Sequence, residues 1–112
     1  YPAYFRKIRK TMSKQYVIQS RIEAQGGQRA PLGTREEIIN ELAKFNTMAE
    51  ADGGSVLWGP GFRIELPPDE DPIKQMLLHI VEEEIAWLPL VRLAKQFDWS
   101  VMDIETGREL QP

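Results

Sequence analysis

The sequence contains no cysteine, which excludes disulfide bonds, thiolate nucleophiles and thiolate metal sites. No apolar run approaches the roughly 20 residues that a transmembrane helix requires, and the first residues lack the apolar block of a signal peptide. We therefore expect a soluble, cytoplasmic protein without a membrane span. Histidine is scarce as well, because His79 is the only one. Catalysis that needs several imidazoles is excluded.

Acidic residues are missing from the first 22 positions, which hold six basic residues and therefore carry +6. The remainder has eight basic and seventeen acidic residues, or −9, in agreement with the net charge of −3. Near the start, apolar residues recur at helical spacing between basic ones, as Tyr4, Phe5, Ile8 and Met12. This pattern predicts a basic amphipathic helix over residues 1–14, followed by a single α+β domain over residues 15–112.

Local signals predict the elements of that domain. Residues 15–24 alternate as a half-buried strand does, and a capping box at Thr34 to Glu37 starts a helix that ends before Gly53. The glycines around Pro60 indicate a hairpin turn rather than a phosphate-binding loop, because the loop runs into a strand and not into a helix.

A long helix is predicted to begin at Pro72 and to reach Phe97, with a kink or break caused by Pro89, and residues 99–104 form the last strand. The resulting order, β-α-β-β-α-β, predicts a ferredoxin-like fold with a four-stranded antiparallel sheet and both main helices on one face. The N-terminal amphipathic helix is then an addition to this fold. An alternative is an α+β meander in which the first strand continues that helix.

In this arrangement one sheet face is free of helices and is expected to carry Gln19, Arg21, Glu23, Arg63 and Glu65. RNA-recognition modules stack bases on aromatic residues at such a face, and here the positions are polar and charged. The tryptophans, Trp58, Trp87 and Trp99, are expected in the core.

His79, Glu82 and Glu83 are the weak candidates for a metal site, because spacings of three and four residues place them on neighbouring surface of one helix. A metal-dependent hydrolase that uses them is one alternative function. No cofactor is expected, since no other catalytic constellation is present, and we expect a protein that is not an enzyme.

The sequence most favours a small non-enzymatic module that binds a protein partner or associates with itself as a homodimer. A nucleic-acid-binding protein, whose basic helix contacts phosphates, is the other alternative. The residues expected to bind a partner come from the N-terminal helix and the open sheet face: Tyr4, Phe5, Arg6, Lys7, Ile8, Arg9, Lys10, Met12, Arg21, Glu23, Arg63 and Glu65.

Overall fold

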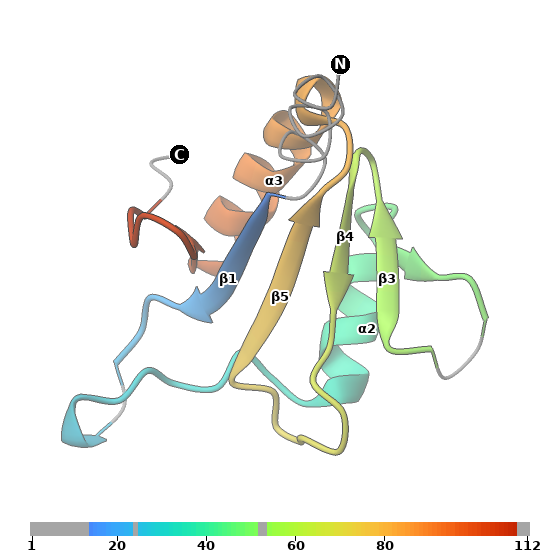
Figure 1. The fold of residues 1–112 in the computed structure, drawn as a ribbon. Helices are drawn as coiled ribbons and strands as arrows, with labels where there is room; N and C mark the ends of the chain where they lie inside the picture. Colours follow the sequence, from blue (N-terminus) through green and yellow to red (C-terminus); the bar gives the residue numbers. More distant parts are fainter. Residues whose placement is uncertain (1–13, 24, 52–53, 110–112) are drawn as a thin grey trace.

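A six-stranded antiparallel sheet with two α-helices forms the fold in a computed structural model, which describes residues 14–23, 25–51 and 54–109. Along the chain the elements are β1 (Gln15–Ser20), the 3₁₀ turn η1 (Gln25–Gly27), α2 (Arg35–Ala43), β2 (Met48–Ala49), β3 (Val56–Gly59), β4 (Phe62–Glu65), β5 (Gln75–Ile80), α3 (Glu83–Phe97) and β6 (Trp99–Asp103). In space the strand order is β2-β3-β4-β5-β1-β6. Both helices lie behind the sheet in Figure 1, so no helix of the described residues covers the other face. Neither helix of the described residues has the length and apolar character to cross a membrane.

The predicted ferredoxin-like fold is wrong, although the α+β class is right. The sheet has six strands instead of four because β2 and β5 were not predicted. The residues of β5 were assigned to the first half of a long helix, yet Met76, Leu78 and Ile80 are buried on one face at a period of two. β5 pairs with β4 on one side and β1 on the other, which makes it a central strand. β5 carries apolar residues on both faces, since Leu77 stands between the buried Met76 and Leu78, and such a run resembles a buried helix in sequence.

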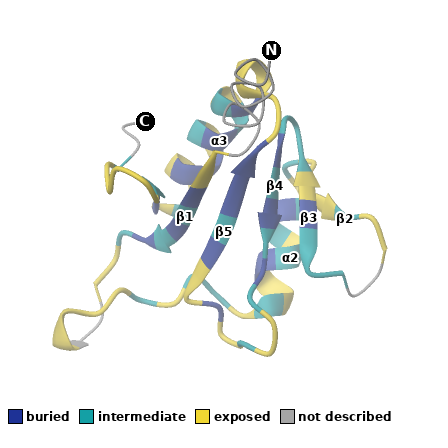
Figure 2. Ribbon diagram, in the orientation of Figure 1, coloured by how far each residue is buried: buried dark blue, intermediate teal, exposed yellow. Residues whose placement is uncertain are grey.

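The core lies between the sheet and the two helices. Its strand residues alternate with open-face residues, as Tyr16 and Ile18 do in β1 and Phe62 and Ile64 in β4. Ile38 and Leu42 of α2 and the face of α3 that carries Leu90 close the layer from behind. Figure 2 shows this distribution, with buried residues concentrated in the central strands and exposed residues in the turns.

Helix α2 begins at the predicted capping box. The Thr34 hydroxyl accepts from the Glu37 amide at 3.2 Å, and the Glu37 carboxylate accepts from the Thr34 amide at 2.9 Å. The helix ends at Ala43, earlier than predicted, and Asn46 then takes a left-handed conformation with φ of 57°. This reversal leads the chain into β2. Helix α3 is continuous from Glu83 to Phe97 and includes Pro89, so the predicted break is not observed.

The predicted hairpin is confirmed, with Pro60 and Gly61 as its two turn residues between β3 and β4. Gly61 has φ of 79°, a conformation that glycine adopts without steric cost. At Gly59 the ring of the buried Phe62 comes so close that a Cβ would lie 2.5 Å from its Cζ. Gly61 therefore allows the backbone conformation of the turn, and Gly59 leaves room for the buried Phe62 ring.

Candidate functional site

The open face of the sheet carries two rows of side chains that cross the strands. Strand register defines the first row as Gln15, His79, Arg63, Trp58 and Met48, on β1, β5, β4, β3 and β2. The second row is Met102, Val17, Leu77, Glu65 and Val56, on β6, β1, β5, β4 and β3. Side chains alternate along a strand, so both rows point away from the core residues that separate them. We call these ten residues the open face.

His79 is the most buried polar residue of the open face, with its side chain only 10% exposed. The side-chain amide nitrogen of Gln15, Nε2, lies 3.3 Å from Nδ1 of His79 and can donate a hydrogen bond to it. Nε2 of His79 faces Oε1 of Glu65 at 3.4 Å without forming a hydrogen bond. His79 and Glu65 thus form a loose polar pair in the middle of the face.

Arg63 and Glu65 project from the same strand onto the open face, as predicted. Their closest charged atoms are 4.0 Å apart, and each side chain is more than a third exposed. The Arg63 guanidinium also lies over the Trp58 ring, 5.8 Å from its centroid. Trp58 is 40% exposed, so its prediction as a core residue is wrong. An indole, a guanidinium and a carboxylate therefore share one accessible surface.

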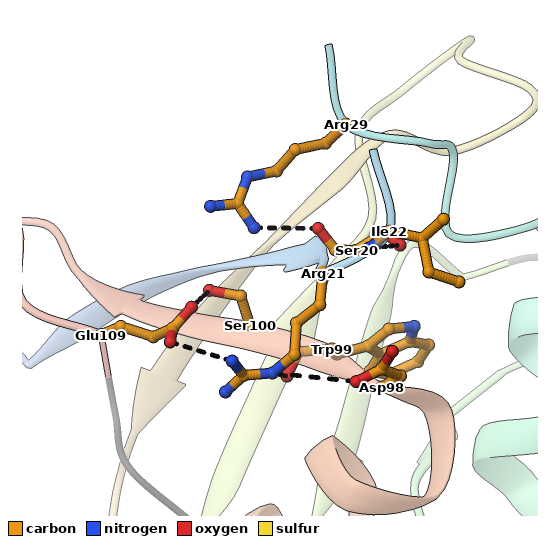
Figure 3. A network of polar contacts seen from close by, with 8 residues as sticks. All are labelled: Ser20, Arg21, Ile22, Arg29, Asp98, Trp99, Ser100 and Glu109. Atoms are coloured by element: carbon orange, nitrogen blue, oxygen red, sulfur yellow. Dashed lines mark hydrogen bonds and ion pairs between the residues drawn. The ribbon is translucent and has the colours of Figure 1, made fainter. Parts of the chain in front are cut away.

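Arg21 and Glu23 do not join this surface, because β1 ends at Ser20. Arg21 forms an ion pair with Glu109 at 3.0 Å, lies 4.0 Å from the Asp98 carboxylate, and donates to the Trp99 carbonyl at 3.2 Å. Figure 3 shows these groups converging where β1 and β6 meet. Glu23 forms an isolated β-bridge with Arg29.

The same network fastens residue Glu109 to the outer edge of β6. The Ser100 hydroxyl donates to the Glu109 carboxylate at 2.5 Å (Figure 3). Met102 forms an antiparallel bridge with Glu109. The hydrogen bond from Ser100 and, to a smaller extent, the charge of Arg21 lower the pKa of Glu109 below its usual value. Ser100 has a carboxylate partner and no imidazole beside it, which indicates a structural link and not an activated nucleophile.

The three metal candidates do not belong to one element. His79 is in strand β5, and Glu82 and Glu83 stand at the start of α3, so the prediction that they share one helix face is wrong. Among residues 14–23, 25–51 and 54–109, no group of three or more His, Asp or Glu side chains is placed to hold a metal ion.

The remaining predicted binding residues, Tyr4, Phe5, Arg6, Lys7, Ile8, Arg9, Lys10 and Met12, fall outside the described residues. Sequence reasoning missed the open-face roles of Trp58, His79 and Leu77. Alternation within residues 75–80 was the available signal for the last two.

No protein-family model, curated protein or solved structure matches this chain.

Proposed function

We propose that this protein is a non-enzymatic self-assembling module in which two copies associate through their open faces. The observation that carries the proposal is the placement of Arg63 and Glu65 two residues apart on one strand and one face. A two-fold axis that lies in the interface, perpendicular to β4 and between these residues, brings each Arg63 opposite Glu65 of the second copy. One surface is then complementary to itself, as a two-fold dimer requires.

The neighbouring open-face residues are compatible with this rotation. It exchanges the two rows, so Trp58 of one copy comes over Val56 of the other, and both are apolar side chains of β3. Val17 and Leu77 lie beside each other in the second row and, with Glu65 and Gln75, line a shallow groove of about 240 Å³. Apolar groups bordered by complementary charges are typical of protein interfaces.

The sheet edges are less suited to association than the face. β2 has only two residues, and the outer edge of β6 is bridged by Glu109. Short or covered edges are the usual protection against edge-to-edge pairing. Six strands spaced about 4.8 Å apart and up to about 20 Å long give a face of roughly 500 Å² in projection. Stable interfaces bury about 800 Å² of accessible surface per partner, so we expect a weak dimer.

Sedimentation velocity over a concentration series tests the proposal with charge reversals. Arg63→Glu and Glu65→Arg each place like charges opposite each other, and each should abolish the dimer. The double variant restores opposite charges across the axis and should dimerise again. Arg92→Glu is the control, since this exposed residue lies on α3 behind the sheet. A wild-type protein that stays monomeric at all concentrations, or single reversals that leave the dimer intact, would overturn the proposal.

The two alternatives from the sequence have their own tests. If the basic residues between Arg6 and Lys10 bind phosphates, affinity for mixed RNA or DNA should fall steeply as salt is raised. A hydrolase that uses His79 would bind zinc or manganese in calorimetry, and this binding should be lost in His79→Ala. The exposed Trp58 beside Arg63 gives the nucleic-acid alternative one additional point of contact.

A further inference from the structure

The end of the domain where the chain enters β1 combines exposed apolar residues with a concentration of negative charge. The Lys14 carbonyl accepts from the Ile80 amide at 3.0 Å, and the next carbonyl, of Gln15, accepts from the Ile104 amide at 3.3 Å. The first described residues therefore run between the segment that follows β5 and the segment that follows β6. We call residues 81–85 and 103–105 together the acidic end.

The apolar side chains of the acidic end are uncovered in the described part of the chain. Val81 is 36% exposed, Ile85 51% and Ile104 46%. Val81 and Ile104 lie on opposite sides of the entering chain, because their segments bond to consecutive residues of it. Ile85 packs over the hairpin turn, since a Cβ on Gly61 would lie 2.6 Å from its Cγ1. Val81 and Ile104 thus flank the chain where it enters β1, and Ile85 adds an exposed apolar side chain over the neighbouring hairpin turn.

The same two segments carry five carboxylates: Glu82, Glu83, Glu84, Asp103 and Glu105. No ion pair within 4.0 Å involves any of them among the described residues, although Asp103 accepts hydrogen bonds from the turn that follows it. Three of these carboxylates affect the pKa of the Tyr16 phenol. Its pKa is raised first by burial and then by the charges of Asp103, Glu83 and Glu105, which come from both segments of the acidic end.

We propose that the acidic end is the docking surface for residues 1–13 of the same chain. The segment offers what this surface lacks, with apolar residues at helical spacing and basic residues between them. An α-helix of about eleven residues is roughly 16 Å long, enough to extend from Lys14 over the first turn of α3. The segment is joined to the domain at the border of this surface, so its effective concentration there is about a millimolar. The same segment of another chain lacks this covalent link, which favours docking within one chain.

Hydrogen exchange of residues 1–13 in the full chain tests this docking. We expect their amides to exchange about tenfold more slowly than those of an unstructured peptide, independently of protein concentration. High salt should reduce the protection. Glu82→Gln/Glu83→Gln/Glu84→Gln should remove most of it, whereas Glu23→Gln/Glu36→Gln/Glu50→Gln changes the net charge equally on exposed residues elsewhere and should not.

The apolar contribution has a separate pair of variants. Ile104→Ser should also weaken the protection, and Ile22→Ser, which alters an isoleucine of similar exposure away from the acidic end, should not. Unprotected amides in the wild type, protection lost on dilution, or equal behaviour of both triple variants would overturn the proposal. Arg63→Glu should keep the protection, because the docking takes place within one chain and does not require a second copy.

Discussion

Replacing Gly61 by alanine is the sharpest test of how the hairpin is fixed against α3. Gly61 has φ of 79°, and its backbone lies directly beneath the first turn of that helix. A Cβ at this position would stand 2.6 Å from Cγ1 of Ile85 and 2.7 Å from the carbonyl oxygen of Glu82. The carbonyl oxygen cannot move aside freely, because it accepts hydrogen bonds from the Ile85 and Ala86 amides at 3.3 and 3.1 Å.

Two separate costs contribute to the expected loss of stability. A left-handed conformation costs a residue with a side chain about 1–2 kcal/mol. Overpacking of a well-filled site typically costs about 1–3 kcal/mol. Gly61→Ala should therefore lower the free energy of unfolding by about 2–5 kcal/mol, a large share of the roughly 5–15 kcal/mol that a domain of this size has.

Urea denaturation of three alanine variants separates these costs. Gly107 also has positive φ, of 71°, but a Cβ added there would meet no atom within 4 Å, so Gly107→Ala should lose only about 1–2 kcal/mol. Gly59 has no left-handed strain but a close Phe62 ring, so Gly59→Ala should show the overpacking cost alone. If Gly61→Ala and Gly107→Ala differ by less than about 0.5 kcal/mol, the contact with α3 does not constrain the turn and the reasoning is refuted.

Further predictions concern the polar contacts that fasten single elements. Thr34→Ala removes the N-cap of α2 and should lower the free energy of unfolding by about 1 kcal/mol, whereas Thr34→Ser, which keeps the hydroxyl, should cost much less. Glu109→Gln keeps an acceptor for Ser100 but loses the ion pair with Arg21, and urea denaturation should show a loss of about 0.5–1 kcal/mol at neutral pH. Hydrogen bonds lower the pKa of Glu37 and Glu109 in the folded state, so around and below pH 4.5 the unfolded chain binds more protons than the folded chain. The free energy of unfolding should therefore fall as the pH is lowered through this range. Urea denaturation of Glu109→Gln at the same pH values should show a smaller fall.

Sequence reasoning succeeded where a signal is local. The capping box at Thr34 and the turn at Gly61 each depend on residues within four positions of each other, and both were predicted correctly. The final strand is bounded by a turn and was also found. Such signals identify an element without information about its neighbours.

The prediction failed in β5, where apolar residues on both faces of the strand obscure its period. In β5, Met76, Leu78 and Ile80 face the helices while Leu77 and His79 face the open side. Nearly every position is thus apolar or buried, and the sequence does not distinguish a period of two from one of 3.6. Only pairing with β4 and β1, which are distant in sequence, selects the strand.

The candidate site was predictable to the same limited extent. Arg63 and Glu65 follow a clear alternation in the hairpin, so their shared face could be predicted. Arg21 continues the alternation of β1 in sequence, but the strand ends before it, and the ion pair with Glu109 holds it at another place. Ion pairs between residues 88 positions apart leave no local pattern.

Charge connects the two proposed surfaces and gives a further prediction for a chain that begins at Met12. Residues 1–14 carry five basic residues and no acid, whereas residues 15–112 carry nine basic and seventeen acidic residues, or −8. Docking of the basic segment on the acidic end reduces the repulsion between two such domains. The truncated chain keeps only Lys14 of the five basic residues, so its dimer should be weaker than that of the full chain at low salt, and the difference should shrink at high salt as repulsion is screened.

Sedimentation of both chains at two ionic strengths measures this difference. An equally weakened dimer at both salt concentrations would instead mean that residues 1–11 contact the second copy directly through their apolar side chains, because apolar contacts are not screened.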